Sequence, residues 1–412
     1  MKDNISKLTG CYGCGVCIAV CPVKVIEMEE NPNGFYSPVI HDEDKCIDCG
    51  ACLDICAFNH REVGSSDNGI RAYAVWSRNI DVRYACSSGG AGFEIGRYLI
   101  QRGYRACGVR YNIDERRAEH YIAETIDDFV LSIGSKYIPS FSVTGFTRIN
   151  RQEGKYFVVG TPCQIDSFRR YIRRFKIEDR FVLMDFFCHG VPSLLLWRKY
   201  IAEVENTVGP VECVAWRNKA TGWHDSWAMT FDRHSQSEDN RKLENSDSPK
   251  MSARQNSHSY ISRLSQGDLF YKFFLNDLCL SPCCYSSCKY KMLSSAADIR
   301  IGDLWGRAFK NDDKGTSGVI SFTSKGNDII QNLSDKCVIE PQSVEVVTEG
   351  QMIRSPSVPF AHDSTMRQLC SVKSLLRIDR SLLLRIYWAY LFLVRFIGRV
   401  FRVLKRIAGC LK

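Results

Sequence analysis

The feature that most constrains this chain is a cysteine spacing that occurs twice near its beginning. Residues 11–21 read CYGCGVCIAVC and residues 46–56 read CIDCGACLDIC, so both follow C-x2-C-x2-C-x3-C. Three closely spaced thiolates can hold one 4Fe-4S cluster, while the fourth, on the following helix, reaches a second cluster. The repeat therefore predicts a small unit that is built around two iron–sulfur clusters.

The spacing also assigns each cysteine to a cluster, because the fourth cysteine of each run serves the other cluster. Pro22 follows the first run, as the bacterial ferredoxin pattern expects, whereas Ala57 replaces the second proline. Zinc also binds four thiolates, but it would not need two three-plus-one runs. We predict a bacterial-type two-cluster ferredoxin domain over residues 1–62. One cluster takes Cys11, Cys14, Cys17 and Cys56, and the other takes Cys46, Cys49, Cys52 and Cys21.

The total of 20 cysteines bears on the redox compartment. The first residues, MKDNISKLTGC, contain no apolar segment typical of a secretory signal. We therefore expect a cytoplasmic protein, in which thiols stay reduced and dense cysteine clusters indicate metal ligation rather than disulfides.

Beyond the cysteine repeat, the chain alternates between strand-like and helix-like segments. The apolar runs RAYAVW, KYFVVG and RFVLMDFF are typical of buried strands. This alternation predicts a mixed α/β domain with an N-terminal part at 71–165 and a C-terminal part at 166–350. The polar stretch that begins at His234 predicts a flexible insertion over residues 234–258.

Three segments of this region carry residue types that suit a ligand site. In CSSGGAGFEIGRYL the small residues precede a helix, whose first N–H groups can bind a phosphate. In KYFVVGTPCQIDSF, Thr161 is a predicted N-cap, and the helix dipole would favour the thiolate of Cys163. In RFVLMDFFCHGVPS, Cys188 follows a strand. Taken singly, each segment is more often an ordinary turn or a buried structural cysteine than part of a ligand site.

Taken in order, the motifs are more specific. They are SSGG at 87–90, GSKY at 134–137, GTPCQ at 160–164, FCHGVPS at 187–193, RNKATGW at 217–223, the cysteine loop at 279–291, ADIRIGDLWG at 297–306 and DDKGTSGVI at 312–320. This ordered set resembles the beta-subunit family of coenzyme F420 hydrogenases and dehydrogenases. Many members of that family also carry an N-terminal two-cluster ferredoxin module.

The resemblance implies a flavoprotein with a further iron–sulfur cluster. The FAD would be bound by Ser88, Gly89, Gly90, Lys136 and Thr161, with Lys136 as a positive group near the ring. The ligands of a third 4Fe-4S cluster would be Cys163, Cys188, Cys284 and Cys288. The loop reads PCCYSSC instead of the family's usual C-x2-C pair, so Cys283 is an alternative ligand. No catalytic residue follows from the motifs.

These cofactors imply an oxidoreductase that relays electrons between a ferredoxin-type donor and a two-electron substrate, since flavin can pool single electrons. The resemblance further implies partners: a soluble electron donor or acceptor protein, and a small-molecule substrate in polysaccharide or lipid-linked sugar metabolism. The alternatives are a non-catalytic electron-transfer protein that works at the membrane surface and a member whose α/β region is only a scaffold.

The positive charge of the chain is confined to its last residues. The net charge is +9, and residues 366–412 contain eleven Lys or Arg and one Asp, a net of +10, so residues 1–365 carry 9 − 10 = −1. This distribution argues against nucleic acid as a partner.

The basic segment at 366–412 predicts an amphipathic helical tail. Its longest uncharged run, 386–394, is far shorter than the roughly 20 residues that cross a bilayer. Arg395, Arg399, Arg402 and Arg406 recur at helical spacing, and Trp388 and Tyr390 suit an interface. We expect contact with the inner face of the membrane, and the alternative is a terminal helix that docks on this protein or on a partner subunit.

Overall fold

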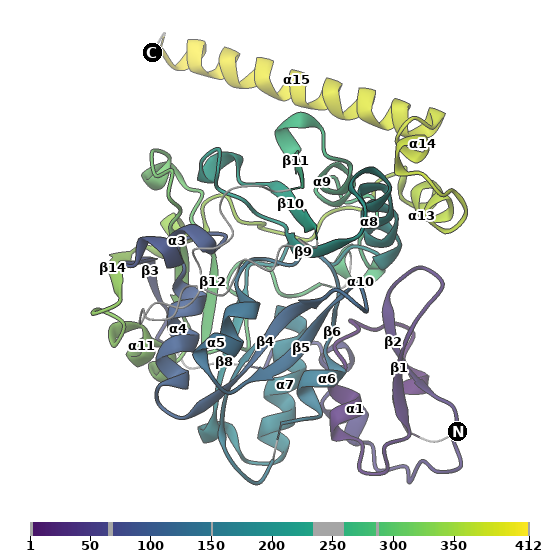
Figure 1. Cartoon of the computed structure of the whole chain (residues 1–412), viewed down its shortest axis with the longest axis vertical. Coiled ribbons are helices and arrows are strands. Elements are labelled where there is room, and N and C mark those ends of the chain that lie inside the picture. The colour runs from purple at the N-terminus through teal and green to yellow at the C-terminus, as the bar shows by residue number, and fades with distance from the viewer. Residues whose placement is uncertain (1–2, 65–68, 150, 234–258, 286–287, 411–412) are drawn as a thin grey trace.

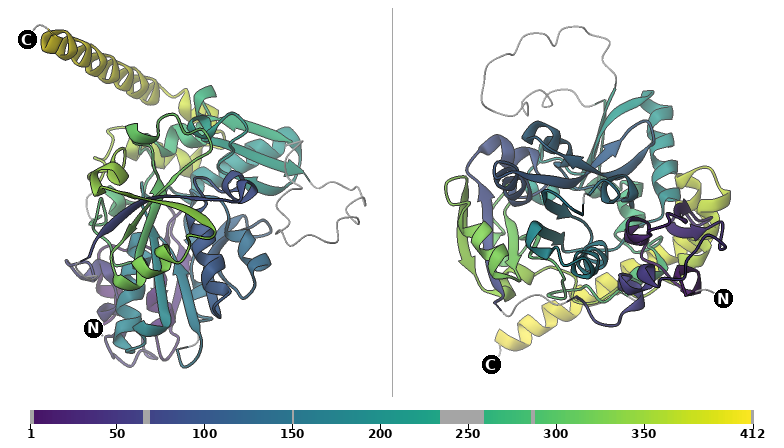
Figure 2. Two further views of the ribbon diagram at one scale, coloured as in Figure 1. Left: turned by 90° about the vertical axis from the view of Figure 1, so that its left-hand side faces the viewer. Right: turned by 90° about the horizontal axis from the view of Figure 1, so that it is seen from below.

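The computed structural model describes residues 3–64, 69–149, 151–233, 259–285 and 288–410, and the predicted insertion at 234–258 lies outside them. These residues form a mixed α/β structure with one large mixed sheet, as the sequence predicts (Figure 1). A small cysteine-rich unit lies against one side of the large sheet's domain, and a long helix crosses the top of the molecule as seen in Figure 1 (Figures 1 and 2).

The cysteine-rich unit consists of short elements that the repeat explains. Each cysteine run places its third thiol on a short helix that begins after a glycine, Gly15 (φ 73°) or Gly50 (φ 65°). A Cβ atom on Gly15 would lie 2.2 Å from Ser142 Oγ, so only glycine allows this close approach to the larger domain. The elements are η1 (Ile5–Lys7), α1 (Val16–Val20), the antiparallel pair β1 (Ile26–Glu30) and β2 (Tyr36–Ile40), α2 (Ala51–Asp54) and η2 (Ala57–Asn59).

The large sheet has nine strands in the order β14-β3-β13-β12-β8-β7-β4-β5-β6. Its centre, β12-β8-β7-β4, is parallel, and the remaining pairs are antiparallel except β5-β6. The three predicted strand runs are all present, as β3, β7 and β8. The bounds are β3 (Arg71–Ser77), β4 (Tyr104–Asn112), β5 (Arg117–Ala123), β6 (Ser140–Phe141), β7 (Lys155–Val159), β8 (Phe181–Phe186), β12 (Ile299–Asp303), β13 (Ser317–Ser321) and β14 (Cys337–Gln342).

Helices cover both faces of this sheet, and the strand period sorts the side chains between them. In β7, Tyr156 and Val158 pack with Phe168 of α7, whereas Phe157 packs with Phe93 of α4 on the other face. The predicted start of α7 is confirmed, because Thr161 and Gln164 form a capping box. The helices of this domain are α3 (Ile80–Ala85), α4 (Ala91–Ile100), α5 (Ile126–Phe129), η3 (Val130–Ser132), α6 (Val143–Phe146), α7 (Pro162–Arg174), η4 (Glu178–Arg180), η8 (Arg307–Phe309), α11 (Ser324–Gln331) and α12 (Val344–Thr348).

A third group of elements packs around a core rich in aromatic residues. Trp197, Trp216 and Phe231 are almost completely buried there. The group contains the antiparallel sheet β11-β10-β9 and the C-terminal helices. Its bounds are α8 (Leu194–Val208), β9 (Val211–Ala215), η5 (Trp223–Asp225), β10 (Ala228–Arg233), β11 (Tyr260–Arg263), η7 (Leu264–Gln266), α9 (Leu269–Phe274), α10 (Pro282–Tyr285), α13 (His362–Ser371), α14 (Leu375–Asp379) and α15 (Leu382–Cys410).

Specific hydrogen bonds fix the cysteine-rich unit on the large domain. The Ser167 hydroxyl, on α7, lies 3.3 Å from the Cys14 thiol and accepts a bond from the Ala57 N–H at 3.0 Å. Lys289 donates to the carbonyls of Ala57 (3.0 Å) and His60 (2.7 Å). Buried polar contacts of this kind require one geometry, so they orient the unit.

In the described part of the chain, no helix has both the length and the apolar character needed to cross a membrane.

Candidate cofactor site

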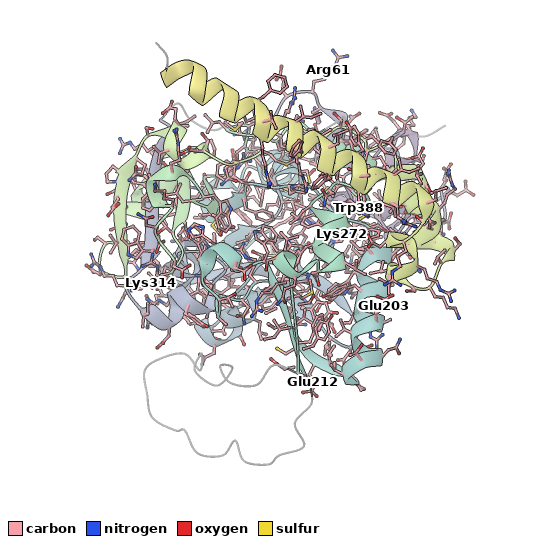
Figure 3. The ribbon with its side chains drawn as sticks, turned by 90° about the horizontal axis from the view of Figure 1, so that it is seen from above. Arg61, Glu203, Glu212, Lys272, Lys314 and Trp388 are labelled. Atoms are coloured by element: carbon pink, nitrogen blue, oxygen red, sulfur yellow. The ribbon has the colours of Figure 1, made fainter. Side chains whose placement is uncertain are left out.

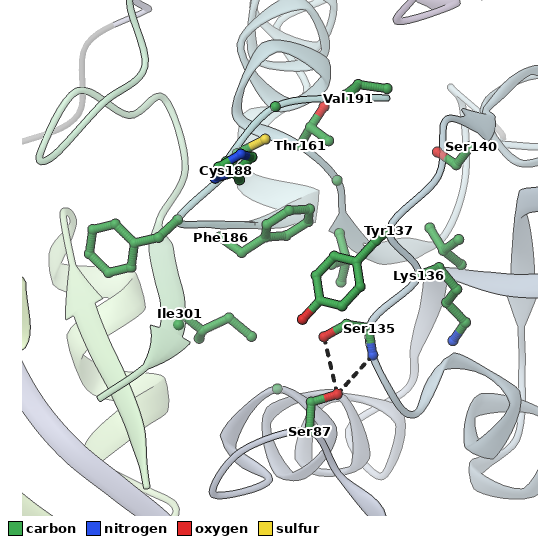
Figure 4. Close-up of a pocket in the computed structure, with 18 of the residues that line it drawn as sticks. Ser87, Ser135, Lys136, Tyr137, Ser140, Thr161, Phe186, Cys188, Val191 and Ile301 are labelled. Carbon is green, nitrogen blue, oxygen red and sulfur yellow. Dashed lines mark hydrogen bonds between the residues drawn. The ribbon is translucent and has the colours of Figure 1, made fainter. Parts of the chain in front are cut away.

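A cavity of about 500 Å³ lies at the carboxyl ends of β7 and β8. These two strands are parallel neighbours, so the loops that follow them meet at one edge of the sheet, where α/β folds commonly bind ligands. The start of α4, the loop 132–140 and the cysteine loop at 281–284 complete the wall. Segments far apart in the sequence therefore surround one space (Figure 4).

One wall of the cavity carries three of the predicted ligands of a third cluster. Cys163, Cys188 and Cys284 line it, and the other two thiols both raise the pKa of Cys163. Cys288 belongs to the same group, because it raises the pKa values of Cys188 and Cys284. The structure thus brings together four cysteines that the sequence separates by up to 125 residues, from Cys163 to Cys288 (288 − 163).

Burial acts on Cys163 in the direction opposite to the effect predicted for the helix dipole. The sequence suggested that the helix dipole would favour its thiolate, but burial raises its pKa well above the ordinary value. Burial likewise raises the pKa of Cys188 to about 11 and that of Cys284 to about 12. Loss of solvation therefore favours the protonated thiol at all three positions.

A cation lies beside this group of thiols. The Lys291 ammonium donates to the carbonyl oxygens of Cys188 (2.7 Å) and His189 (3.0 Å), and its charge lowers the pKa of Cys188 against the larger effect of burial. A positive charge at this position suits a set of four thiolates.

The adjacent cysteines of the loop face different neighbours. Cys284 Sγ accepts a hydrogen bond from the Val191 N–H at 3.4 Å and lies with Cys188. Cys283 is buried, and its thiol accepts a hydrogen bond from the backbone N–H of Cys11. The geometry therefore favours Cys284 for the third group, whereas Cys283 lies between Cys288 and the ferredoxin-like unit.

The cysteines of the ferredoxin-like unit lie close to one another. The pKa of Cys17 is raised by burial and then by Cys14, Cys11, Cys56 and Cys52. Cys21, Cys46, Cys49 and Cys52 surround a second, small cavity of about 20 Å³. Among the described residues, no three His, Cys, Asp or Glu side chains are arranged to hold a single metal ion. A 4Fe-4S cluster instead takes one thiolate on each of four irons.

The opposite wall of the large cavity contains the serine and glycine segment. The Ser87 hydroxyl accepts bonds from the Ser135 N–H (2.9 Å) and hydroxyl (3.1 Å) and so joins this segment to the loop 132–140 (Figure 4). Ser88 lines the cavity and donates to the Thr316 carbonyl, and Gly90 (φ 90°) is the N-cap of α4. Gly89 packs behind this wall, where a Cβ atom would lie 2.3 Å from the Val75 carbonyl oxygen.

The remaining two predicted flavin residues also line the cavity. The Thr161 hydroxyl lies 3.2 Å from the Cys163 sulfur, which joins this wall to the cysteines. The Lys136 ammonium donates to the carbonyls of Leu131, Ile133 and Gly134 at 3.0–3.2 Å, so it folds back onto its own loop. Figure 4 shows this amine directed away from Tyr137.

Sequence reasoning missed a polar network next to the cavity. Arg217, with a side chain only 1% exposed, donates from Nη1 to the Tyr137 hydroxyl (3.2 Å) and to Asp303 Oδ2 (3.0 Å). The guanidinium lies near the rings of Trp227 and Trp305. Asp303 Oδ1 is buried and has no hydrogen-bond partner among the described residues. The motifs GSKY and RNKATGW contained Tyr137 and Arg217, but nothing in the sequence indicated that the two residues meet.

Comparisons with known proteins agree with the motifs. Residues 153–346 match the family described as the C terminus of the coenzyme F420 hydrogenase/dehydrogenase beta subunit, and residues 10–60 match the 4Fe-4S dicluster domain. No curated protein matches the sequence. Among solved structures, a chain of the xenon-derivatised F420-reducing [NiFe] hydrogenase complex from Methanosarcina barkeri is similar, with a TM-score of 0.44 and 15% identity over 76% of this chain and 90% of that chain. The present chain thus joins a 4Fe-4S dicluster domain to the C-terminal domain of coenzyme F420 hydrogenase/dehydrogenase beta subunits, which is the domain pair of an iron–sulfur oxidoreductase of this beta-subunit type.

Proposed function

We propose that this protein is a flavin-dependent iron–sulfur oxidoreductase that passes electrons between a ferredoxin-type donor and a two-electron substrate. Three 4Fe-4S clusters and one FAD would carry the electrons. The observation that supports this most is the large cavity, which has the third cysteine group on one wall and the start of α4 on the other. A cluster and a flavin held there would be neighbours.

The residues around the cavity suit a flavin. The volume of about 500 Å³ is within the range of cofactor sites, which is roughly 300–1,000 Å³. Phe186, Phe187, Trp227 and Trp305 give it an apolar, aromatic lining. The buried, unpaired Asp303 Oδ1 could accept a hydrogen bond from a bound group.

The residues that would hold the cofactor lie at the start of α4 and α7. Ser88, Gly90 and the first N–H groups of α4 suit a phosphate, and Thr161 lies at the N-terminus of α7. When bound, FAD would exchange single electrons with a cluster and electron pairs with the substrate.

Tyr137 is the residue that we assign to proton transfer in this cavity. Burial raises its pKa, so its hydroxyl stays protonated at neutral pH. Arg217 donates a hydrogen bond to this hydroxyl and holds it in place, and Asp303 accepts a hydrogen bond from Arg217 and so holds the guanidinium. A positioned phenol can supply the proton that accompanies a two-electron reduction.

The order of the cysteine groups suggests the direction in which electrons reach the cavity. Cys49, of the group around the small cavity, is exposed, which suits contact with an external electron-transfer protein. The other ferredoxin group contains Cys14, which meets Ser167 one turn of α7 after Cys163. Electrons would therefore pass from the exposed group to the buried group and then to the cavity.

For the substrate we propose a lipid-linked sugar at the inner face of the membrane. Support comes from the segment that follows Met352, the last residue of this part of the chain that lines the cavity. The next residue, Ile353, is 76% exposed, so an exposed apolar side chain adjoins the wall. A substrate with a lipid portion could contact both.

Anaerobic purification followed by iron and flavin analysis tests the proposal. Three clusters predict about twelve iron atoms per chain with one flavin. About twelve or eight iron atoms without flavin would instead support a non-catalytic electron carrier. A chain that binds no iron would contradict both functions.

A further inference from the structure

We infer that α15, together with Phe360, forms a docking surface for an anionic membrane. The apolar side of the helix would enter the boundary between headgroups and acyl chains, and the body of the protein would lie on the aqueous side. This inference does not depend on the flavin.

The inner side of α15 faces the body of the protein through its first three turns. Leu384 and Tyr387 are buried, and Trp388 and Leu391 are half-buried against the same core. The Trp388 indole donates to Asp379 Oδ1 at 2.9 Å. The sequence suggested Trp388 as an interface residue, but the structure turns it inward, next to Lys272 (Figure 3). This inner row fixes the direction of the helix.

The outer side of α15 is a continuous apolar row that the body does not cover. Its members recur every three or four residues, the spacing of one helix face, and are 41–75% exposed. Figure 2 shows the helix projecting past the body of the molecule. The row consists of Leu382, Ile386, Tyr390, Leu393, Ile397 and Val400.

The charge of the helix indicates what covers this row. Arg395 and Arg399 continue the inner row at helical spacing after Leu391, and Arg395 Nη2 donates to Asn276 Oδ1 at 2.8 Å. Residues 382–412 contain seven Lys or Arg and no Asp or Glu, a net charge of +7. An apolar face combined with basic residues and no acidic ones is typical of a helix that lies in an anionic headgroup layer. Each basic residue near such a surface strengthens binding about fivefold.

A second copy of the chain fits this helix less well. Two α15 helices could bury their apolar rows against each other, but residues 382–412 of each copy carry a net charge of +7 with no acidic residue to offset it. The two positively charged segments would therefore repel each other. Charge complementarity therefore favours lipid.

The docking surface is connected to the cavity through two segments. The Phe360 ring is 54% exposed and contacts the rings of Tyr387 (5.2 Å) and Tyr390 (5.7 Å). It belongs to the segment that leaves the cavity wall at Met352. Leu275 also lines the cavity, and the next residue, Asn276, accepts hydrogen bonds from Tyr387 and Arg395. The membrane would thus lie beside the cavity wall.

Flotation of the full-length holoprotein with vesicles tests the inference. Vesicles of phosphatidylcholine alone are compared with vesicles that also contain phosphatidylglycerol. The test variant combines Leu393→Glu with Ile397→Glu. The control combines Ile70→Glu with Ile80→Glu, two similarly exposed apolar residues outside the tail. Iron content and helicity verify that each variant folds, and light scattering gives its mass.

We expect the wild type and the control to float with anionic vesicles. Their binding to neutral vesicles should be weaker by a factor of about ten or more. The test variant should bind anionic vesicles about tenfold more weakly or worse, because two apolar side chains that would enter the membrane become charged. Equal flotation of the test variant and the control would overturn the inference. The inference would also be overturned if the wild type formed a dimer that does not bind vesicles and the test variant were a monomer. The apolar row would then be covered by a second copy of the chain.

Discussion

The thiol of Cys14 lies 3.3 Å from the hydroxyl of Ser167, a residue 153 positions later in the chain. Ser167 is four residues after Cys163, so both lie on one face of α7. This helix therefore joins a predicted ligand of a ferredoxin cluster to the cysteine group at the cavity. We propose that electrons pass between the two groups along this contact.

Replacing Ser167 by Ala should lower the reduction potential of the cluster that Cys14 holds. The hydroxyl can donate to the thiolate, and hydrogen bonds to cluster sulfurs stabilise the reduced state. A hydrogen bond of about 0.5–1.5 kcal/mol corresponds to roughly 20–60 mV for one electron. Redox titration followed by electron paramagnetic resonance measures the shift. Ser142→Ala is the control, because Ser142 donates to the Cys14 carbonyl and not to its sulfur. An equal shift in both variants would refute the prediction.

The adjacent cysteines of the loop should differ in their effect on iron content. Cys284→Ser should reduce iron from about twelve to about eight atoms per chain, because Cys284 lies with Cys163 and Cys188. Cys283→Ser should keep the full iron content, since Cys283 faces the backbone of Cys11. Iron analysis of anaerobically purified variants distinguishes the two residues. The reverse result would make Cys283 the ligand.

Replacing Gly89 by Ala should disturb the wall of the cavity. Its Cβ atom would lie 2.3 Å from the Val75 oxygen and 2.7 Å from the Ser317 nitrogen, both backbone atoms. We expect a loss of about 1–3 kcal/mol in the free energy of unfolding, together with a lower flavin content. Gly69→Ala is the matched control, because a Cβ atom there has no neighbour within 4 Å. Denaturant unfolding and flavin fluorescence measure the two effects, and unchanged stability of Gly89→Ala would contradict the geometry.

His120 should make the stability of the protein depend on pH below neutrality. Its Nε2 donates to the Val159 carbonyl (3.0 Å), its Nδ1 accepts from Ser140 (3.1 Å), and burial lowers its pKa from 6.5 to about 4. Between these values the unfolded chain binds the proton and the folded chain does not. This contribution is therefore complete above pH 6.5 and is lost as the pH falls toward 4, with a total of about 3 kcal/mol.

The free energy of unfolding of the wild type and of His120→Gln, measured across this pH range, isolates the contribution of His120. The difference between the two proteins should shrink as the pH falls. Parallel curves would indicate that His120 does not titrate differently in the folded state.

Much of the fold could be predicted because its signals are local. A buried strand such as β8 needs only a short apolar run, and the start of α7 needs only Thr161, Pro162 and Gln164 close together. The order of the sheet was not predictable, because β12, β13 and β14 return from late in the chain to flank β3 and β8. That order follows from the packing of distant segments.

The candidate site divides in the same way. The motifs identified the lining residues Ser88, Lys136 and Thr161, but the direction of the Lys136 ammonium follows from three carbonyls that only the folded loop brings together. The pairing of Tyr137 with Arg217 likewise spans 80 residues.

The sequence by itself determined that this protein has a two-cluster ferredoxin domain, because the spacing of thiols within a short segment limits which cluster they can reach. It also determined that the tail is basic and that its longest uncharged run is too short to cross a bilayer. Only the tertiary structure decided that Cys163, Cys188 and Cys284 share one wall and that the apolar row of α15 faces outward. Both depend on contacts between residues far apart in the chain, whose geometry is set by the burial of surfaces and not by local spacing.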